Sequence, residues 1–412
     1  MSTPPAWNRQ RLRSNNEWLL LERLRTEGPA SRAQLARDSG LSKPTVSSAL
    51  AALARAGLVR EAGTHAQRRG RVAVLYEPDP GAGHVLGIDI GRARLRTAVA
   101  DLSGTVVARA ELPNRGRGAT SVADAAVACA AGALADAGLT TADIVHTAVG
   151  TPGVFDRTTG RVRYAVNLPG WGRPGLVERM RESLGTPLSV HNDANLAALG
   201  EHAFGTGAGS RLFVYVLIGT GLGLGVVADG ELFVGAHGAA GEIGFLPLDG
   251  VPAGGSAPRR GLLEDAVSAD AVVRSARAAG LTGPLTAKRV FDAARAGDPA
   301  ATAAVRQEGE RLALAVAGVT AVLDPDLVVL GGGVGAGADL LLTTVTDTLH
   351  RLTPLRPRLA ASTTGPDAVL LGALTLALRA ARPLVFTRRT QSQPQPQPLP
   401  QPLPRPLARP EP

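Results

Sequence analysis

Three glycine-rich turns, each directly after an apolar segment, restrict most strongly the fold that this chain of 412 residues can adopt. The turns lie at Gly91, at Gly219 to Gly225 and at Gly331 to Gly333. Glycine lets backbone N–H groups approach a phosphate closely, and an aspartate at a strand end, such as Asp89, can hold Mg²⁺ through water. One such turn is weak support, because tight glycine turns are common. Three of them indicate a sheet-containing fold with phosphate-binding loops.

The segments around these turns alternate between strand and helix patterns. Strands are predicted at His84 to Ile90, Arg96 to Asp101, Val106 to Leu112, Ile144 to Val149, Leu212 to Ile218, Leu224 to Ala228 and Leu327 to Leu330, and a helix at Thr120 to Gly138. Such alternation favours an α/β body, here of two lobes. The three loops in this order resemble the actin/hexokinase-like (ribonuclease H-like) type of ATP-binding fold.

Composition narrows the class of protein. Hydrophobic residues make up 44% and charged residues 19% of the chain, which is typical of a globular protein. The longest apolar runs, such as Leu312 to Leu323, hold about 12 residues, fewer than the roughly 20 of a membrane-spanning helix. The polar N-terminus has no apolar signal core, so a cytoplasmic location is expected. Cys129 is the one cysteine of the sequence, which excludes an internal disulfide framework and any multi-cysteine metal site.

The net charge of +9 is unevenly distributed. Residues 1–76 contain 13 Lys+Arg and 5 Asp+Glu, whereas residues 77–380 contain 26 and 29. A basic segment before a near-neutral body is typical of a polyanion-binding domain. We therefore predict a DNA-binding domain at 1–78, the two-lobed domain at 79–382 and a disordered Pro/Gln-rich tail at 383–412.

The basic segment has the pattern of a winged helix-turn-helix. Its predicted elements are helices at Asn16 to Leu24, Ser31 to Gly40 and Ser42 to Gly57, followed by strands at Leu58 to Arg60 and Val72 to Tyr76. Ser31 and Gln34 match a capping box, and Ser42 can cap the third helix. The loop between the two strands contains His65 and several arginines. A three-helix module that docks another protein is the alternative interpretation.

The candidate DNA contacts lie on the third helix and in this loop. They are Ser42, Lys43, Thr45, Ser47 and Ser48 on the helix, and Arg68, Arg69 and Arg71 in the loop. The helix residues avoid the predicted buried stripe of Val46, Leu50 and Leu53, and their short polar or cationic groups suit a major groove. The loop arginines suit phosphates or a minor groove.

Further motifs occur between and after the glycine loops. They are Gly150-Thr151-Pro152-Gly153, Asn167-Leu168-Pro169-Gly170-Trp171, Asn192-Asp193-Ala194-Asn195 and His237-Gly238-Ala239-Ala240-Gly241-Glu242-Ile243-Gly244-Phe245. In this order, behind a winged helix, they resemble the ROK family of repressors and sugar kinases over essentially residues 9–380.

The resemblance implies a sugar site and a nucleotide site. Sugar hydroxyls would be held by Asn192, Asp193, Glu242 and Glu264, and in kinase members Asp193 would be the general base. Metal and phosphates would be held by Asp89, Gly91, Thr220, Gly221, Gly223 and Gly332.

Two departures from the family pattern oppose catalysis. The usual Asp-x-Gly-Gly-Thr loop is Asp89-Ile90-Gly91-Arg92-Ala93 here, so it gains a bulky cation and loses a hydroxyl that would position phosphate. The positions of the family's four zinc ligands hold Phe245, Gly255, Ala257 and Leu262, none of which can bind zinc. His237 is a single imidazole nearby, and one histidine does not make a zinc site, so no metal is expected.

These features predict a DNA-binding transcriptional regulator, a repressor of carbohydrate-related genes, whose kinase-like body senses a sugar or sugar phosphate. A homodimer or dimer of dimers would bind an inverted repeat in double-stranded DNA on the nucleoid, with no membrane partner. The regulator would require no cofactor. The alternatives are an ATP-dependent sugar kinase that uses Mg-ATP and carries an accessory DNA-binding domain, and a regulator that has lost sugar sensing.

Overall fold

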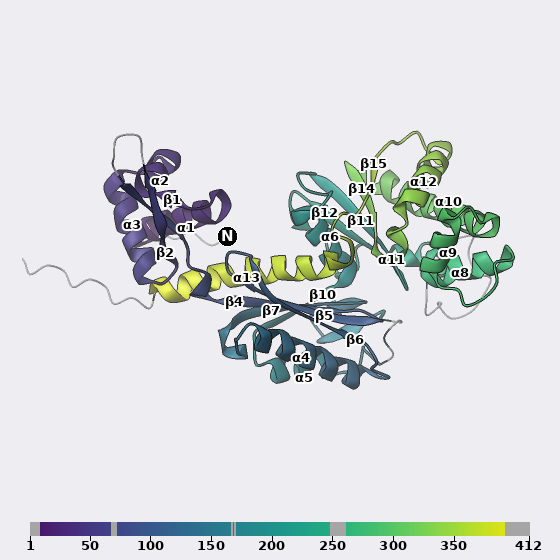
Figure 1. The fold of residues 1–412 in the computed structure, drawn as a ribbon, viewed down its shortest axis with the longest axis horizontal. Helices are drawn as coiled ribbons and strands as arrows, with labels where there is room; N and C mark the ends of the chain where they lie inside the picture. The colour runs from purple at the N-terminus through teal and green to yellow at the C-terminus, as the bar shows by residue number, and fades with distance from the viewer. Residues whose placement is uncertain (1–8, 67–71, 166–167, 169, 248–260, 392–412) are drawn as a thin grey trace, which may run out of the picture. The chain divides into compact units, whose positions relative to one another are not determined.

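A computed structural model describes residues 9–66, 72–165, 168, 170–247 and 261–391 (Figure 1). The chain divides into two compact units, Met1–Asp79 with Leu384–Pro412, and Pro80–Pro383. Helices and strands alternate through the second unit, and this confirms the predicted α/β class.

The first unit contains a winged helix-turn-helix. Its elements are α1 (Arg9–Glu27), β1 (Ala30–Ser31), α2 (Arg32–Ser39), α3 (Lys43–Arg55), β2 (Val59–Ala66) and β3 (Val72–Pro78), and its strands lie in the order β1-β3-β2. Both predicted caps are present, because Ser31 Oγ accepts the N–H of Gln34 and Ser42 Oγ accepts that of Thr45, each at 3.3 Å. The predicted stripe on α3, which consists of Val46, Leu50 and Leu53, is fully buried.

Three elements of this unit are longer than predicted, and one of them is β3, which continues to Pro78 instead of ending at Tyr76. Helix α1 begins at Arg9 rather than at Asn16, and β2 continues to Ala66, so His65 lies in a strand instead of a loop. The strand continues because β3 supplies an antiparallel partner as far as Ala66, with a register shift between Glu61 and Gly63.

The C-terminal end of α13 (Ala368–Gln391) belongs to the first unit. Phe386 packs edge-on against Trp18 of α1, with ring centroids 5.0 Å apart, and Arg389 donates to the carbonyl oxygen of Gly57 at 2.9 Å. The helix thus continues beyond 383, where the disordered tail was predicted to start. Pro383 lies inside the helix, and burial of apolar side chains beyond it outweighs the hydrogen bond that a proline removes. The rest of the predicted tail lies outside the described residues.

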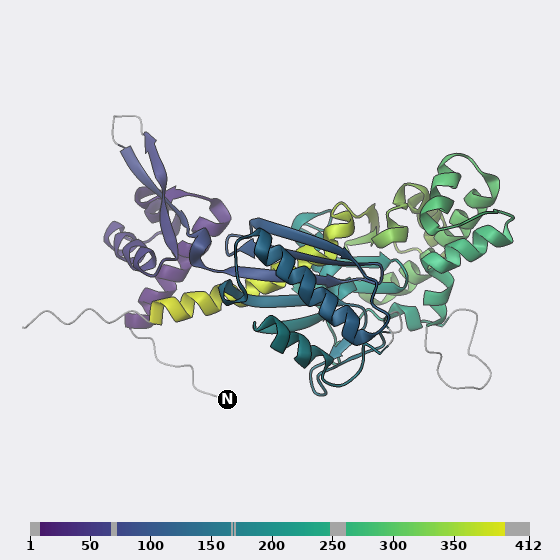
Figure 2. The ribbon, with the colours of Figure 1, turned by 60° about the horizontal axis from the view of Figure 1, so that its bottom comes forward.

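The first lobe of the second unit is built on a five-stranded sheet in the order β10-β7-β4-β5-β6. Its elements are η1 (Pro80–Ala82), β4 (His84–Ile90), β5 (Arg94–Asp101), β6 (Val106–Pro113), α4 (Ala119–Asp136), η2 (Thr141–Asp143), β7 (Ile144–Thr151), β8 (Val154–Asp156), β9 (Arg161–Arg163), α5 (Leu176–Leu184) and β10 (Leu188–Asn192). Helices α4 and α5 cover one face of this sheet, and the part of α13 in this unit lies on the other (Figures 1 and 2).

The second lobe has a sheet in the order β13-β12-β11-β14-β15. Its elements are α6 (Asp193–Phe204), β11 (Leu212–Ile218), β12 (Leu222–Ala228), β13 (Glu231–Leu232), η3 (Ile243–Phe245), α7 (Leu262–Val267), α8 (Ala269–Ala278), α9 (Ala287–Arg295), α10 (Pro299–Leu323), β14 (Leu327–Gly331), α11 (Gly332–Gly335), α12 (Ala338–Leu352), β15 (Arg358–Ala361) and η4 (Gly365–Asp367). Side chains of α7 to α12 form the main core with one face of this sheet.

Helices α6 and α13 pack together closely enough to require glycine. A Cβ atom on Gly200 would lie 2.1 Å from the carbonyl oxygen of Ala368, and one on Gly372 would lie 1.9 Å from that of Leu196. Glycine at both positions lets the two backbones touch. This contact fixes α6, the helix that begins at the candidate site residue Asp193.

Two helical segments, Ala119–Asp136 and Gly365–Gln391, are long and apolar enough to cross a membrane by length and composition alone. The search for uninterrupted apolar runs missed them because scattered polar residues divide each one. In α4, Val122, Ala126 and Ala130 are buried in the core of the first lobe. This is the behaviour of a core helix.

A buried carboxyl group in α10 gives a first testable prediction. Glu308 is 1% exposed, and burial raises its pKa to about 8 against the opposing effect of Arg311. In the folded protein Glu308 therefore keeps its proton up to a pH of about 8, whereas in the unfolded chain it loses the proton near its ordinary pKa of 4.5. Glu308 alone should therefore make the free energy of unfolding fall by at most about 1.4 kcal/mol per pH unit as pH rises between these two values.

Glu308→Gln should remove this slope, because an amide does not titrate. Urea unfolding at a series of pH values measures this slope. Glu310→Gln is the matched control, because Glu310 lies on the same helix and is partly exposed. Equal slopes for wild type and Glu308→Gln would contradict the assignment.

Candidate functional site

The candidate DNA-binding surface lies on α3 and the adjacent part of α1. Lys43 and Ser48 are exposed, whereas Thr45 and Ser47 are half-buried. Ser42 Oγ also lies 2.8 Å from Thr45 Oγ1, so the capping hydroxyl holds a neighbour as well as the helix end. Arg68, Arg69 and Arg71 lie outside the described residues.

A shallow hollow of about 400 Å³ lies beside this face of α3. It is lined by Leu12, Arg13, Asn16, Pro44, Thr45, Ser48 and Ala49. Arg13 and Asn16 of α1 therefore join Thr45 and Ser48 as candidate contacts. Arg13 was not predicted as a contact because the first helix was predicted to begin at Asn16, after this residue. The basic charge of the segment was the one sequence signal that pointed to it.

The polar groups of the candidate sugar site begin at the junction of β10 and α6. Asn192 caps α6 by accepting the N–H of Asn195 at 3.1 Å, and its Nδ2 donates to the carbonyl oxygen of Gly153 at 3.2 Å. Asp193 is the first residue of α6, and its Oδ1 accepts the N–H of Ala194 at 2.8 Å. The motif therefore lies at a strand-to-helix junction, where Asn192 ends β10 and positions the turn.

Two further carboxyl groups lie near Asp193. Burial, together with the negative charges of Asp193 and Glu264, raises the pKa of Glu242 to about 7. Burial likewise raises the pKa of Asp193 to about 6, with Glu264 contributing in the same direction. Glu264 lies in α7 and is 8% exposed. The structure thus brings three of the predicted sugar ligands into one electrostatically coupled cluster, which suits hydrogen bonding to hydroxyl groups.

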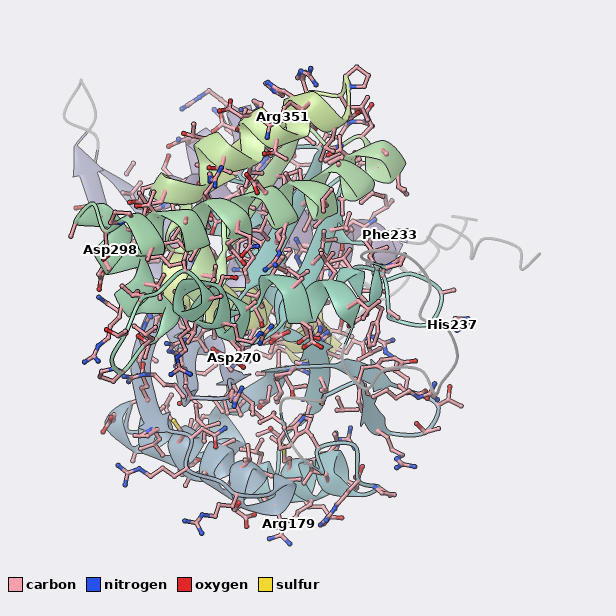
Figure 3. The ribbon with its side chains drawn as sticks, turned by 90° about the vertical axis from the view of Figure 1, so that its right-hand side faces the viewer. Arg179, Phe233, His237, Asp270, Asp298 and Arg351 are labelled. Carbon is pink, nitrogen blue, oxygen red and sulfur yellow. The ribbon has the colours of Figure 1, made fainter. Side chains whose placement is uncertain are left out.

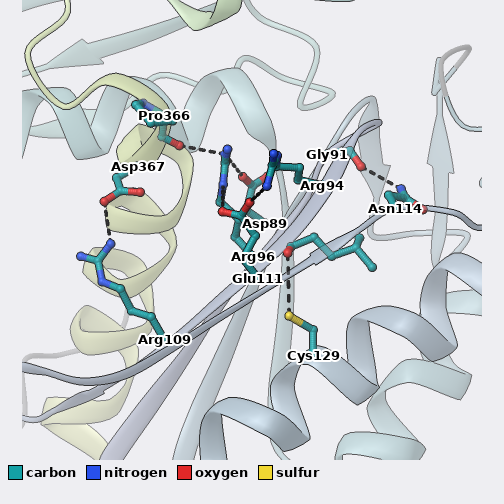
Figure 4. Close-up of polar contacts among 11 residues, drawn as sticks. Asp89, Gly91, Arg94, Arg96, Arg109, Glu111, Asn114, Cys129, Pro366 and Asp367 are labelled. Carbon is teal, nitrogen blue, oxygen red and sulfur yellow. Dashed lines mark hydrogen bonds and ion pairs between the residues drawn. The ribbon is translucent and has the colours of Figure 1, made fainter.

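Asp89, the predicted metal and phosphate residue, faces a guanidinium group (Figure 4). Arg96 Nη1 lies 3.5 Å from Asp89 Oδ2, and Arg96 Nε donates to Glu111 Oε2 at 3.1 Å. Burial raises the pKa of Asp89 to about 7, Arg96 opposes this, and the charge of Asp193 adds to it. Asp89 is therefore close enough to Asp193 to interact with it, but a cation of the chain itself already lies beside it.

The glycine turns follow strands β4, β11 and β14, but the second one is shorter than predicted. Strand β12 begins at Leu222, so Gly223 and Gly225 pair with Leu217 and Tyr215 of β11 instead of lying in a loop, because the antiparallel ladder continues to that point. The N–H of Gly91 donates to the carbonyl oxygen of Arg94, and Asn114 Nδ2 donates to the carbonyl oxygen of Gly91. In the second loop, the N–H of Gly219 donates to the carbonyl oxygen of Gly221 at 2.9 Å. The remaining residues predicted for this site are Thr220, Gly223 and Gly332, the last with φ of 82°. Some of the N–H groups expected to face phosphate are thus used within the turns.

The residues at the family's zinc positions do not fit a metal ion. Phe245 ends η3, and its ring packs against that of Tyr164, with centroids 5.7 Å apart. Leu262 begins α7, and Gly255 and Ala257 lie outside the described residues. His237 is exposed on the loop between β13 and η3 (Figure 3). Within the described part of the chain, no group of three or more His, Cys, Asp and Glu residues could hold a metal ion.

A fully buried glutamate at the C-terminal end of α6 was not singled out from the sequence. Glu201 accepts hydrogen bonds from the N–H groups of Thr206, Thr363 and Thr364, at 2.8, 2.9 and 3.2 Å. The hydroxyl groups of Ser362, Thr363 and Thr364 also donate to it. This carboxylate ties α6 to the segment that follows β15, and so it holds the helix that carries Asp193.

Comparison with known proteins agrees with this architecture. The ROK family profile matches residues 85–380, and the MarR family profile matches residues 14–62. A glucokinase of Halalkalibacterium halodurans is 33% identical over 315 residues, which are 70% of this chain and 92% of that enzyme. The xylose repressor of Caldicellulosiruptor bescii is 25% identical over 358 residues, 84% of this chain and 89% of the repressor.

Two solved structures show the same relationships. A ROK family glucokinase from Streptomyces griseus in complex with glucose and AMPPNP has a TM-score of 0.63 at 29% identity. The match covers 72% of this chain and 100% of that glucokinase. A ROK family transcriptional regulator, a homolog of the E. coli MLC protein, has a TM-score of 0.73 at 24% identity. The match covers 92% of this chain and 99% of that regulator. Together with the match over residues 85–380, these similarities show that the chain belongs to the ROK family and carries a MarR-like winged helix at its N-terminus.

Proposed function

We propose that the protein is a transcriptional regulator that represses carbohydrate-related genes and binds a sugar effector in its kinase-like body. The observation that carries this proposal is the Asp89–Arg96 ion pair in a chain that also has a winged helix. A guanidinium group lies beside the carboxylate that a kinase would direct toward the metal of ATP, while Asn192 and Asp193 keep their places at the start of α6. The similarity to a xylose repressor over 84% of the chain supports the same proposal.

In this proposal hydrogen bonds recognise the hydroxyl groups of the sugar ring. Asp193, Glu242 and Glu264 accept hydrogen bonds from sugar hydroxyls, and Asn192 holds the turn that carries Asp193. Sugar binding between the lobes changes their closure, and with it the spacing of two winged helices in a cytoplasmic dimer on an inverted repeat. The sugar has this effect only if it binds the two conformations with different affinities.

The experiment uses the full-length protein and the DNA that flanks its own coding region. A footprint on that DNA should be present without sugar and should disappear when one member of a panel of hexoses, pentoses and their phosphates is added. The same sugar should raise the melting temperature of the protein. Absence of any footprint would contradict the proposed function.

A sugar kinase is the second candidate function. The position of Asp193 at the N-terminus of α6, with its pKa raised to about 6, favours it, because a general base works best when its pKa is near the working pH. The similarity to glucokinases also supports it. Binding of Mg-ATP would require Asp89 to leave Arg96, so we expect no phosphorylation of the sugar panel in a coupled-enzyme assay with ATP.

A prediction on metal content follows from Phe245 and Leu262. Neither an aromatic nor an aliphatic side chain can ligate zinc, so the purified protein should contain no stoichiometric zinc by elemental analysis. Treatment with a chelator should leave its melting temperature unchanged. One tightly bound zinc ion per chain would contradict the assignment of these positions.

A prediction on DNA affinity follows from the basic winged helix. Because release of counterions from DNA should supply most of the affinity, log Kd should depend steeply on log salt concentration. Replacement of Arg68, Arg69 and Arg71 by alanine should flatten this dependence, as measured by fluorescence anisotropy. Thr45→Ala should instead change the preference among operator sequences, because its hydroxyl is proposed to face base edges. An unchanged salt dependence in the triple variant would show that these arginines do not contact DNA.

A further inference from the structure

Two aromatic side chains from different lobes meet beside the proposed sugar site. Tyr164 follows β9 of the first lobe and Phe245 ends η3 of the second, and their rings pack edge-on at 5.7 Å with an interplanar angle of 67°. Their exposed fractions are 53% and 42%. Aromatic residues make up 3% of the whole sequence, so an exposed pair in contact is unusual for this chain. Burial in a core does not explain it.

The backbone of Tyr164 is held in an unfavourable conformation. Its φ of 61° lies in the left-handed region, which bulky residues rarely adopt. Gly153 leaves the space for this segment, because a Cβ atom there would lie 2.4 Å from the carbonyl oxygen of Arg163. Strained residues that surrounding contacts hold in place occur often at ligand-binding positions. The strain here holds an exposed ring rather than a core side chain.

Both aromatic residues belong to backbone segments that adjoin the polar groups of the sugar site. Gly153 lies against Arg163 and Ala165, the two neighbours of Tyr164 in the chain, and its carbonyl oxygen accepts a hydrogen bond from Asn192 Nδ2. The N–H of Phe245 donates to the carbonyl oxygen of Glu242 at 3.3 Å. The neighbouring Gly244 lies against Glu264, since a Cβ atom there would be 3.1 Å from that of Glu264. The pair therefore borders the cluster of Asn192 and the three carboxyl groups.

We propose that Tyr164 and Phe245 form a second subsite, for the apolar face of an additional ring. This inference rests on the proposed sugar site. The carboxyl groups and Asn192 satisfy the hydroxyls of one sugar ring, whereas two exposed rings offer apolar contact to the C–H face of a pyranose or to an aryl group. The effector class is then a glycoside of at least two rings, such as a disaccharide, rather than a free monosaccharide.

The experiment compares matched ligands on the full-length protein by calorimetry. The probes are the methyl and phenyl β-glycosides of glucose, xylose, galactose and N-acetylglucosamine, with the corresponding β-linked disaccharides. For the sugar that binds, the phenyl glycoside and the disaccharide should bind at least tenfold more tightly than the methyl glycoside. Phe245→Leu and Tyr164→Asn, the latter tolerant of positive φ, should each reduce this ratio to below threefold while leaving the affinity for the methyl glycoside nearly unchanged.

Phe204→Leu is the matched control. Phe204 is 62% exposed at the opposite end of α6 from Asp193, so this variant should keep the full ratio. Equal affinities of the wild type for methyl and phenyl glycosides would overturn the second subsite and leave the proposed sugar site standing. Failure of every sugar and glycoside to bind would overturn both.

Discussion

Glu201→Ala should lower the free energy of unfolding by about 3–5 kcal/mol. The carboxylate is fully buried and accepts three backbone N–H groups and three hydroxyl groups from two separate segments. Its removal leaves the N–H groups of Thr206, Thr363 and Thr364 without their acceptor. A hydrogen bond to a charged group contributes about 1.5–3 kcal/mol, compared with about 0.5–1.5 kcal/mol for an average hydrogen bond. The α6 helix would also lose its attachment at the end distant from Asp193.

Urea unfolding at pH 7 measures this loss. Glu182→Ala is the control, because Glu182 is exposed on α5, and it should change the free energy of unfolding by less than about 0.5 kcal/mol. The hydrogen bonds hold the pKa of Glu201 below its ordinary value of 4.5 against the effect of burial. The stabilisation is therefore complete above pH 4.5 and is lost as pH falls through the folded-state pKa, so the difference between wild type and variant should shrink in acid. A difference that grows in acid would contradict this account.

Local patterns in the sequence were enough to predict some of the elements that carry the candidate sites, but not η3 beside Glu242 or α7 with Glu264. The caps at Ser31 and Ser42 depend on residues three positions apart, and the strand-to-helix junction at Asn192 depends on adjacent residues. A cap needs only a side-chain oxygen and a backbone N–H group a few positions further along the chain, so the local sequence contains its whole signal. The order of the glycine loops and motifs then indicated the family, which the comparison with known proteins confirms.

The ion pair of Asp89 was missed because the sequence analysis predicted the strands but not how they pair. Asp89 and Arg96 are direct partners in the antiparallel pairing of β4 with β5, and Arg96 is also the partner of Glu111 in β6. The predicted strand Arg96 to Asp101 contained Arg96, but without a predicted pairing the guanidinium group could not be placed between the carboxyl groups of Asp89 and Glu111. With the hairpin turn reduced to the residues between Ile90 and Arg94, the pairing could have been predicted from alternation alone.

Contacts between distant segments had no such signal. The partners of Glu201 in the segment after β15 are more than 160 positions away in the chain, and no spacing rule connects them. The packing of Phe386 against Trp18 joins the two ends of the described chain. A proline at 383 next to a Pro/Gln-rich segment is typical of a helix end, but the burial of Phe386 overrides it. These features depend on the tertiary fold, and local propensity cannot reveal them.

Asp193→Asn should separate the regulator from the kinase. The change keeps the shape of the side chain but replaces an anionic acceptor with a neutral amide. For a regulator, loss of a charge-assisted hydrogen bond should weaken sugar binding by roughly 1.5–3 kcal/mol, about ten- to a hundredfold. DNA binding without sugar should persist, because the winged helix belongs to the other compact unit. The variant should therefore remain on its operator at sugar concentrations that release the wild type.

For a kinase, the same substitution should reduce turnover far more than it weakens sugar binding, because a general base acts in the transition state. Sugar affinity, operator release and phosphorylation are measured on wild type, on Asp193→Asn and on Asp136→Asn, an exposed carboxylate at the end of α4 that should behave as wild type. Robust phosphorylation by the wild type that disappears in Asp193→Asn would overturn the regulator proposal. Absence of turnover in all three proteins, with the response to sugar lost only in Asp193→Asn, would support it, because only a binding role for Asp193 produces that combination.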